Sequence, residues 1–428
     1  MVFKPEFSWE FLSKDEITAR SLKALRNHIA HLKEVSPFYR EQLAAVEPSD
    51  ITSFDTFAQL PFTDRTTLVN DVERFRAVPE SEIAETVVTS GATGKPLIFS
   101  MTKSDLDRLA FNEALSLHAA GVIPEDRAQI LISLDRLFIT GMSFYRGLTS
   151  LGVNTARIGE LSFDQYKQHL DLLKPTVLIG IPSFLKKLAQ HLVDAGLDLK
   201  ASSVQKIICV SESLRNESLQ LNSVGQKLQE LFGAHVYSSY GVTELSVAYC
   251  ECVEQNGNHT HPELIYTEII DEHGKPVPDG TPGELVGTPL GVEGIPLLRY
   301  RTGDMSFTLP GGCGCGRNSI RIGPIPARKS QMIKLEGTML YPQTITDALD
   351  ELEYVNDYVI LLEGDESFAD RVTLHVATQP TMLESLSTHL RAKTQVTIPV
   401  LISNVATINA YREDSKRKDK IIDRRKRK

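Results

Sequence analysis

The chain is organised around the sequence Val87-Val88-Thr89-Ser90-Gly91-Ala92-Thr93-Gly94-Lys95-Pro96. The two β-branched valines predict the end of a strand. The small residues after them allow backbone N–H groups to turn toward one point, while the hydroxyls and the lysine add donors and positive charge. This composition is typical of a loop that holds phosphates. It differs from the P-loop pattern, because the two glycines are three residues apart and no Ser or Thr follows the lysine. The alternative is an ordinary turn rich in Gly and Thr.

Length and charge exclude several classes of protein. The chain has 428 residues, which is longer than a single hydrophobic core usually grows, so we expect two or more domains. The formal net charge of −9 argues against a general nucleic-acid-binding protein. The sequence contains no run of about 18 apolar residues that could span a membrane, and its first residues contain no apolar signal core. We therefore expect a cytoplasmic protein without nucleic-acid or membrane partners.

The spacing of apolar residues predicts an α/β fold. Residues 8–45 repeat apolar side chains at helical intervals, and Ser36-Pro37 closes that segment. Between residues 129 and 238, short apolar runs alternate with amphipathic segments, which predicts parallel β-α units. The expected strands are 129–134, 175–181, 206–210 and 235–238, and the expected helices are 164–173, 183–197 and 217–231.

The pattern changes after about residue 263. Strands joined by turns are expected at 263–270, 283–289 and 299–304, as in an antiparallel barrel or sheet. We place a domain boundary near 325–337. Beyond that boundary we expect a small α+β unit of about 100 residues, with helices at 343–352 and 382–393 and strands at 357–362 and 371–376.

Two short motifs place an acidic residue shortly after a predicted strand or turn in the sequence. Tyr240-Gly241-Val242-Thr243-Glu244 offers a tight turn, a hydroxyl and a carboxylate, and Glu244 is a reasonable Mg²⁺ ligand. Taken alone, Glu244 is an acid at a helix N-terminus, which the helix dipole favours. Arg299-Tyr300-Arg301-Thr302-Gly303-Asp304 puts a carboxylate after a glycine turn, where it could accept hydrogen bonds from ribose hydroxyls. Taken alone, this second motif is a charged turn.

Four of the five cysteines form two C-x-C pairs, Cys250/Cys252 and Cys313/Cys315. A large cytoplasmic chain is not expected to use them for structural disulfides. His259 and His261 follow the first pair closely, and clusters of thiols and imidazoles on separate loops are what a closed tetrahedral zinc site needs. The alternative is buried thiols without a metal.

Taken together and in this order, these stretches resemble those of the acyl-adenylate-forming ligases, and most of all the phenylacetate–coenzyme A ligase group. The resemblance covers nearly the whole chain, because it includes Ser36–Arg40, Leu60–Thr63 and the C-terminal unit. It implies an α/β protein whose large N-terminal domain, residues 1–328, contains mixed parallel sheets and a β-barrel-like subdomain. A small, mobile α+β domain, residues 329–428, is expected to follow as a lid.

The resemblance also implies an activity. An ATP-dependent ligase of this family converts a small carboxylic acid into an acyl-adenylate, releases pyrophosphate, and transfers the acyl group to coenzyme A. The alternatives are transfer to a carrier protein or an amine, and a regulatory nucleotide-binding protein without the catalytic lysine. Phe138, Phe144 and Tyr145 favour an aryl or apolar acid, unless these rings belong to the core. A homodimer is a further expectation.

Roles for individual residues come from the same resemblance. The residues expected to hold the β- and γ-phosphates of ATP are Thr89, Ser90, Gly91, Thr93, Gly94 and Lys95. Those expected around the adenosine are Ser211, Glu212, Ser213, Tyr240, Gly241, Asp304 and Arg328, the last two on the ribose. Thr243 is expected to reach the α-phosphate and Glu244 to bind Mg²⁺.

The family's catalytic lysine matches Lys416 best, four residues after Arg412. Ser415 stands where the family has Gly, and about one extra residue precedes Ile421-Ile422-Asp423, so Lys418 and Lys420 remain alternatives. The chain also departs from the family at Ala327, where Gly is usual, and at Ser330, where an acidic hinge residue is usual.

Some relatives carry a C-x₆-H and a C-x-C arrangement of metal ligands. That spacing selects Cys252, His259, Cys313 and Cys315 as zinc ligands and assigns no ligand role to Cys250 or His261. Four protein ligands leave no open coordination position, so the expected zinc is structural.

Overall fold

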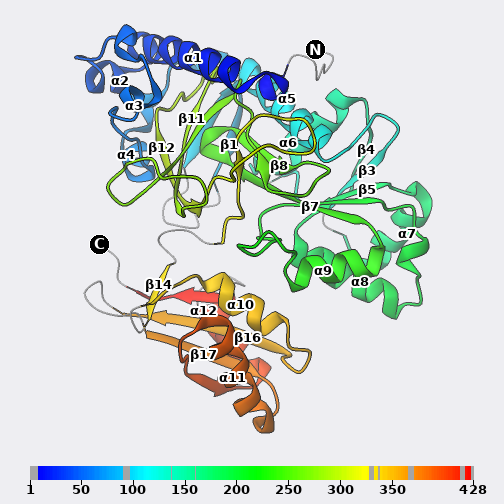
Figure 1. Cartoon of the computed structure of the whole chain (residues 1–428). Helices are drawn as coiled ribbons and strands as arrows, with labels where there is room; N and C mark the ends of the chain where they lie inside the picture. Colours follow the sequence, from blue (N-terminus) through cyan, green and yellow to red (C-terminus); the bar gives the residue numbers. More distant parts are fainter. Residues whose placement is uncertain are drawn as a thin grey trace. The chain divides into compact units, whose positions relative to one another are not determined.

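The computed structural model describes residues 8–89, 97–135, 137–159, 161–326, 332–335, 338–364, 371–414 and 420–425. The chain divides into two compact units, Met1–Pro324 and Ile325–Lys428 (Figure 1). The boundary expected between residues 328 and 329 lies outside the described residues, because the structure does not describe 327–331. Within the described part, no helix combines the length and apolar character needed to cross a membrane.

The first unit opens with two helices, α1 (Lys14–Val35) and α2 (Pro37–Gln42). Ser13 and Glu16 form a capping box that satisfies the first N–H groups of α1. Ser36 ends α1, and its side chain accepts a hydrogen bond from the third residue of α2, where Pro37 is the first residue. The helical region and its break at Ser36-Pro37 are therefore as predicted.

An eight-stranded sheet forms the centre of the first unit, with the strand order β13-β9-β8-β7-β6-β5-β3-β4. The five strands from β7 to β4 run parallel, and β8, β9 and β13 continue the sheet antiparallel. The parallel strands are β3 (Arg127–Ile130), β4 (Asn154–Arg157), β5 (Val177–Gly180), β6 (Lys206–Cys209) and β7 (His235–Val242). The antiparallel ones are β8 (Val247–Glu251), β9 (Asn258–His259) and β13 (Arg321–Ile322).

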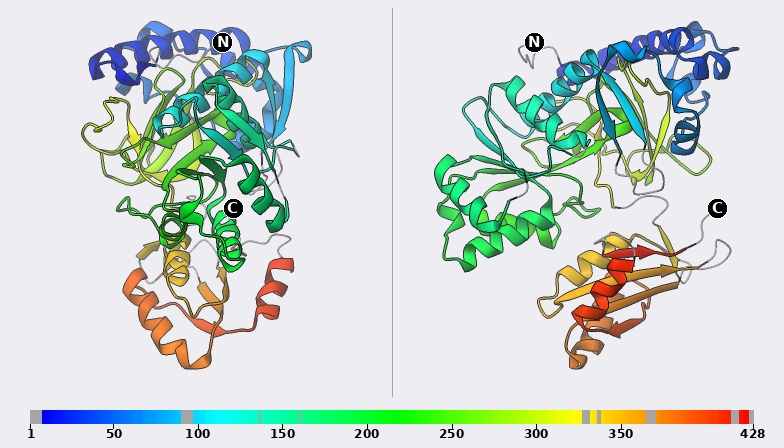
Figure 2. Two further views of the ribbon diagram at one scale, coloured as in Figure 1. Left: turned by 90° about the vertical axis from the view of Figure 1, so that its right-hand side faces the viewer. Right: turned by 180° about the vertical axis from the view of Figure 1, so that it is seen from behind.

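Helices cover both faces of this sheet (Figures 1 and 2). On one face, α5 (Lys103–Ala119) and α6 (Ile139–Leu151) enclose a core with Ile130, Ile179 and Ile208. On the other face, α7 (Phe163–Leu173), α8 (Pro182–Asp194) and α9 (Ser223–Phe232) enclose a second core with Leu178 and Ile207. Neighbouring residues of one strand thus belong to different cores, as parallel strands buried on both faces require.

The helix expected over 217–231 begins later than predicted, at Ser223. The side chain of Asn216 accepts hydrogen bonds from the backbone N–H groups of Ser218 and Gln220, both at 3.0 Å, and Leu219 has a φ of 63°. This local turn competes with the helix. Asn222 then caps α9 by accepting from the N–H of Gly225.

The antiparallel part of the first unit is a three-stranded sheet, β10 (Ile265–Ile270), β11 (Gly283–Pro289) and β12 (Tyr300–Ser306). Its register pairs Thr267 with Gly287 and Gly287 with Tyr300. A separate hairpin joins β1 (Ile83–Val88) and β2 (Ile98–Thr102) on either side of the Gly-rich stretch. The expected antiparallel region is present, and its closure as a barrel stays a prediction.

The second unit is a small α+β domain, as predicted. Its sheet has the order β18-β17-β16-β19, from β16 (Asp357–Glu363), β17 (Arg371–Ala377), β18 (Val400–Ile402) and β19 (Ile421–Asp423). Two helices, α10 (Pro342–Asp350) and α11 (Leu383–Thr394), pack on the face that carries Ile360 and Leu362. The third, α12 (Val405–Asp414), packs on the face that carries Val359 and Leu361 (Figure 2).

Candidate functional site

One arginine joins two of the motifs that the sequence singled out. Arg65 donates one hydrogen bond to Glu244 Oε1 at 2.6 Å and another to Thr89 Oγ1 at 3.0 Å. Glu244 lies in a short 3-10 turn directly after β7, and Thr89 follows the end of β1. Thr89, the first of the expected phosphate-binding residues, and Glu244, the proposed Mg²⁺ ligand, therefore both bind the guanidinium of Arg65. The other expected phosphate-loop residues, Ser90–Lys95, lie outside the described residues.

Arg65 is a site residue that the sequence reasoning missed. It is the first residue of α4 (Arg65–Phe75), and the side chain of Asp64 caps that helix by accepting from the N–H of Thr67 at 2.8 Å. The only signal available in the sequence was its position two residues after the Leu60–Thr63 motif. That motif is typical of a turn into a helix, and it does not indicate which part of the chain the helix faces.

The resemblance motifs near the N-terminus hold the segment before Arg65 in place. Tyr39 forms a 2.7 Å hydrogen bond with Thr63 Oγ1, and its hydroxyl also accepts from the N–H of Leu298 at 2.8 Å. The backbone of Thr63 accepts from the N–H of Arg301 at 2.8 Å. Ser36–Arg40, Leu60–Thr63 and Arg299–Asp304 thus form one hydrogen-bonded unit next to the site.

Arg299 reinforces this unit from inside. Its fully buried guanidinium forms two hydrogen bonds with the carboxylate of Glu268, at 3.1 and 3.0 Å. It also donates to the carbonyl oxygens of Ala58 at 2.5 Å and Leu60 at 2.6 Å, and it stacks on the ring of Phe62. A planar guanidinium suits such a set of fixed partners, so Arg299 fixes the chain just ahead of Arg65.

A second pair of predicted residues also meets. The hydroxyl of Tyr240 donates to Asp304 Oδ2 at 2.6 Å, and the ring of Tyr240 stacks on Tyr249 with centroids 6.0 Å apart. Burial, together with the charge of Asp304, raises the pKa of Tyr240 well above its ordinary value. The phenol therefore stays protonated and keeps donating to the carboxylate.

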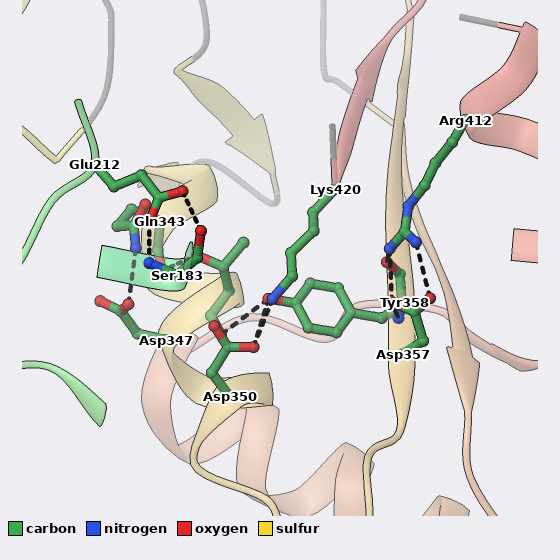
Figure 3. A network of polar contacts seen from close by, with 10 residues as sticks. Ser183, Glu212, Gln343, Asp347, Asp350, Asp357, Tyr358, Arg412 and Lys420 are labelled. Atoms are coloured by element: carbon green, nitrogen blue, oxygen red, sulfur yellow. Dashed lines mark hydrogen bonds and ion pairs between the residues drawn. The ribbon is translucent and has the colours of Figure 1, made fainter. Parts of the chain in front are cut away.

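Glu212 takes part in a contact that the resemblance did not imply. Its carboxylate accepts from the backbone N–H of Ser183 at 2.9 Å and from the Ser183 hydroxyl at 2.6 Å (Figure 3). Ser183 is the second residue of α8, so Glu212 caps that helix where the helix dipole favours a negative charge. Ser211, just before it, adopts a left-handed backbone with a φ of 72°.

Three of the remaining predicted site residues are described by the structure, and three others are not. Gly241 is exposed on β7, Thr243 is half-buried, and the hydroxyl of Ser213 donates to the carbonyl of Arg215. Arg328, Lys416 and Lys418 lie outside the described residues, as do the two departures from the family at Ala327 and Ser330.

The structure describes all three aromatic rings that the sequence analysis considered for contact with the acyl group, Phe138, Phe144 and Tyr145. Phe144 is buried in the core between α5, α6 and the large sheet, so the core alternative holds for this ring. Phe138 and Tyr145 are half-buried. The guanidinium of Arg157 lies over the Tyr145 ring, 4.9 Å from its centroid.

Four potential zinc ligands converge in the first unit. The ligand atoms of Cys252, His259, Cys313 and Cys315 all lie within 4.8 Å of one another. The two Sγ atoms of Cys252 and Cys313 are 3.5 Å apart, and Cys315 Sγ is 3.5 Å from His259 Nε2. A tetrahedral zinc ion with bonds of about 2.1–2.3 Å holds its ligand atoms about 3.6–3.8 Å apart, so the donor set and its spacing fit zinc.

The neighbouring groups also suit a closed metal site. Nδ1 of His259 forms a 3.0 Å hydrogen bond with Ser319 Oγ, which leaves Nε2 to face the three sulfur atoms. His261 points elsewhere, because its Nε2 bonds Ser116 Oγ at 2.9 Å and its Nδ1 bonds Glu10. Cys250 is buried in the core under α5 and α6. The structure therefore brings together the four residues that the spacing selected.

Comparison with known proteins identifies relatives across most of the chain. The family model described as "AMP-binding enzyme" matches residues 17–289. The chain is 29% identical to a phenylacetate–coenzyme A ligase of Thermus thermophilus over 384 residues, which are 88% of this chain and 84% of that protein. It is 26% identical to a phenylacetate–coenzyme A ligase of Escherichia coli over 377 residues, or 86% of this chain and 84% of that one.

Solved structures show the same fold. A crystal structure of 2-hydroxyisobutyryl-CoA ligase in complex with 2-HIB-AMP superposes with a TM-score of 0.84 at 24% identity, covering 97% of this chain and 91% of that one. A crystal structure of an anthranilate CoA ligase in complex with anthranoyl-AMP gives a TM-score of 0.57 at 18% identity over 76% of this chain and 65% of that one.

Proposed function

This chain belongs to the family of AMP-binding enzymes, and we propose that it is an ATP-dependent ligase that joins a carboxylic acid to coenzyme A through an acyl-adenylate. The relatives named above, which match this chain over most of its length, are coenzyme A ligases. Transfer to a carrier protein or an amine finds no support among them. The observation that carries the proposal is the meeting of Arg65, Glu244 and Thr89 at the end of β7.

Repulsion between negative charges opposes the first half-reaction. An oxygen of the substrate carboxylate attacks the α-phosphorus of ATP, and the bond from that phosphorus to the β-phosphate oxygen breaks as pyrophosphate leaves. Attacking and leaving groups are both anions, so the site must neutralise them and align them. Arg65 would contribute a fixed positive charge next to Thr89, where the expected phosphate loop begins. A lysine from the second unit, which we assign as Lys416, would contribute another.

Glu244 fits the proposed role of magnesium ligand. A carboxylate is the ligand type that Mg²⁺ prefers, and the Mg²⁺ ion would neutralise phosphate charge when it is bound. Arg65 bridges the Glu244 carboxylate and the Thr89 hydroxyl, so it keeps the two side chains near each other. Tyr240 and Asp304, which touch each other, would serve the adenine face and the ribose hydroxyls of one adenosine. Ser211 and Ser213, on either side of Glu212, remain proposed contacts of the adenine.

In the second half-reaction the thiol of coenzyme A attacks the acyl carbon of the mixed anhydride, the thioester forms, and AMP leaves. We propose that the second unit, residues 329–428, moves between the two half-reactions, as a hinged lid does. The proposed acid is small, and an aryl or apolar acid suits the half-buried rings of Phe138 and Tyr145.

A pyrophosphate-release assay tests the proposed function. Purified protein, ATP and Mg²⁺ are incubated with phenylacetate, benzoate, 2-hydroxyisobutyrate and acetate, each with and without coenzyme A, and the products are separated by mass. We expect acid-dependent pyrophosphate release and an acyl–coenzyme A product from at least one acid of the panel. Release of pyrophosphate without any thioester in the presence of coenzyme A would contradict the proposed acceptor.

We further propose that Cys252, His259, Cys313 and Cys315 hold a structural zinc ion. Three sulfurs and one imidazole complete a tetrahedron and leave no position for substrate, so no catalytic step is assigned to this site. A cytoplasmic location and a homodimer are also part of the proposal. Fractionation of the cells that make the protein tests the first, and sedimentation equilibrium of the purified chain tests the second.

A further inference from the structure

Two side chains of α5 bind the backbone that directly follows the turn of Glu244. The helix packs along β8 (Figure 1), and Arg108 and Asn112 are four residues apart, so they lie on the same face of it. The guanidinium of Arg108 donates to the carbonyl oxygen of Ser246 at 2.7 Å. The side-chain amide of Asn112 accepts from the N–H of Ala248 at 2.6 Å and donates to the carbonyl oxygen of the same residue at 3.2 Å.

Arg108 also joins this backbone to the antiparallel sheet. Its Nε donates to the carbonyl oxygen of Leu290 at 2.7 Å, and its second terminal nitrogen donates to the carbonyl oxygen of Leu264. Leu264 directly precedes β10, and Leu290 directly follows β11. Burial lowers the pKa of Arg108 to about 10, so the side chain stays charged at neutral pH. One planar cation therefore ties the residue after the Glu244 turn to the ends of two strands.

Asn112 replaces a neighbouring strand at one point of β8. Ala248 lies opposite Gly241 of β7, whereas β9 pairs with β8 further along, at Cys250 and Glu251. The fully buried amide of Asn112 bonds both the N–H and the carbonyl of Ala248, as a paired strand would do. The start of β8 is therefore held by a side chain of α5.

The turn itself is also closely packed. Ser246 has a left-handed backbone with a φ of 49°, which a residue with a side chain adopts only when its surroundings hold it there. Leu245 is fully buried, and a Cβ atom at Gly287 of β11 would lie 2.5 Å from Leu245 Cδ1. Because β11 holds Leu245 and α5 holds Ser246, the backbone on the C-terminal side of Glu244 is fixed.

We propose that Arg108 and Asn112 are positioning residues for magnesium binding, because they hold the backbone that sets the place of the Glu244 carboxylate. This inference rests on the proposed function, in which Glu244 binds Mg²⁺. A magnesium ion demands nearly ideal octahedral geometry with short bonds, so a small displacement of one ligand weakens its binding. Residues that orient a metal ligand change metal affinity about 10- to 100-fold when they are replaced.

Nucleotide binding tests the proposal without turnover. The Kd of α,β-methylene-ATP, which cannot release pyrophosphate, is measured by calorimetry with and without added Mg²⁺. For the wild type we expect Mg²⁺ to tighten binding. In Arg108→Lys and in Asn112→Ser this tightening should be about 10-fold smaller, while the Kd without Mg²⁺ should stay within about twofold of wild type. In pyrophosphate exchange the same variants should need about 10-fold more Mg²⁺ for half of the maximal rate.

Arg321→Lys is the matched control for a loss of stability. Arg321 is buried as well, and it donates at 3.0 Å to three backbone carbonyl oxygens, those of Asn256, Pro310 and Gly312. None of these carbonyls belongs to the turn of Glu244 or to the strands that hold it. The variant should therefore lower the thermal midpoint as Arg108→Lys does and keep the wild-type effect of Mg²⁺.

Asn112→Ser keeps the proposal testable if Arg108→Lys does not fold, because it removes one amide and no charge. A wild-type effect of Mg²⁺ in the folded variants would overturn the proposal. An equal loss of affinity with and without Mg²⁺ would overturn it too, because a general disturbance of the site would then explain the result.

Glu244→Gln distinguishes this proposal from the one on which it rests. If Glu244→Gln removes the effect of Mg²⁺ while Arg108→Lys and Asn112→Ser keep it, the positioning role is wrong and the proposed function stands. If Glu244→Gln keeps the full effect, Glu244 is not the ligand and the positioning role falls with that assignment. When both hold, adding Arg108→Lys to Glu244→Gln should not change the Mg²⁺ dependence further, since the two residues act as a unit.

Discussion

At the scale of single residues, the contact between Arg65 and Glu244 is the feature with the clearest chemical consequence. The two side chains are 2.6 Å apart, and both are mostly buried, with 23% and 13% of their side-chain surface exposed. An ion pair of this kind has a fixed geometry and loses little to rearrangement when substrate binds. Removing either partner changes the charge at the proposed phosphate site and leaves the other charge partly buried.

Glu244→Gln should keep the fold and lose Mg²⁺-dependent adenylate formation. The amide cannot supply the negative charge that a magnesium ligand needs, and such a loss costs about 100- to 1,000-fold in rate. The measurement is pyrophosphate exchange as a function of Mg²⁺ concentration, with circular dichroism as the check on folding. A wild-type rate at all Mg²⁺ concentrations would show that Glu244 does not hold the metal.

Arg65→Gln should lower adenylate formation about 100-fold, because one fixed cation next to the phosphates is lost. Arg74→Gln is the matched control, since Arg74 lies on the same helix and pairs with the exposed Glu41. The control should retain its activity, because pairs at the surface contribute little. If Arg65→Gln and Arg74→Gln have the same exchange rate, Arg65 takes no part in the reaction.

Glu113 makes the stability of the first unit depend on pH. Burial raises the pKa of this carboxyl to about 7, and one of its oxygens, Oε2, has no hydrogen-bond partner among the described residues. A carboxyl whose folded pKa lies above its unfolded value contributes stability that is fully present below about pH 4.5 and is lost as the pH rises through about 7.

Replacing Glu113 with Gln should remove this dependence. Glu113→Gln should match the wild type within about 1 kcal/mol at pH 4.5 and exceed its free energy of unfolding by about 2–3 kcal/mol at pH 8.5. Urea unfolding followed by tryptophan fluorescence at the two pH values gives the comparison. A difference between variant and wild type that is the same at both pH values would contradict the raised pKa.

At the scale of elements, the loop that carries Cys313 and Cys315 is also hydrogen-bonded to residues 8–12, near the N-terminus of the described chain. Arg317, next along this loop, donates to Glu10 Oε2 at 2.6 Å, and Asn318 donates to the carbonyls of Glu10 at 2.6 Å and Leu12 at 2.9 Å. A metal bound at the proposed zinc site would therefore also stabilise the attachment of residues 8–12. Metal binding and local folding are coupled in such sites.

Metal analysis of the purified protein should give about one zinc per chain. Cys313→Ser should lose the zinc and lower the thermal midpoint, while its adenylation rate at 20 °C should fall less than twofold, because the site has no open position for substrate. Limited proteolysis should then cut first near residues 8–12. A metal-free wild-type protein of unchanged stability would rule out the zinc proposal.

At the scale of the whole molecule, the residues of the proposed chemistry belong to two compact units. The first unit contains Arg65, Glu244, Tyr240 and Asp304, and the second contains the segment with Lys416. Anionic groups must be neutralised only while ATP is being attacked, so Lys416 of the second unit should be needed for the first half-reaction alone.

Lys416→Ala should therefore abolish formation of the acyl-adenylate and leave thioester formation from added acyl-adenylate within about twofold of wild type. The two rates are measured separately, by pyrophosphate exchange and by release of AMP in the presence of coenzyme A. An equal loss of both rates would indicate damage to the fold or to the coenzyme site. If neither rate falls, the catalytic lysine is Lys418 or Lys420 or is absent, and a regulatory role for the chain gains weight.

The order of helices and strands was largely determined by the sequence alone, because their signals are local. Capping by Ser13 and Ser36 involves residues within four positions, and the alternation of Ile360 and Leu362 with Val359 and Leu361 sets the two faces of β16. The start of α9 departs from the prediction, since the side chain of Asn216 formed a turn that periodicity does not reveal. No element was predicted for α5, α6 or β4. The choice of four metal ligands also followed from sequence spacing, once the family resemblance was known.

Only the tertiary structure decided which side chains meet. Arg65 and Glu244 are 179 positions apart, and their contact depends on the backbone pairing of Thr63 with the strand that begins at Tyr300. The burial of Phe144 and the capping contact of Glu212 depend in the same way on how the helices pack against the sheet. A chain encodes hydrogen bonds between neighbours in its local pattern, whereas contacts across a sheet arise only when strand order and register bring distant residues together.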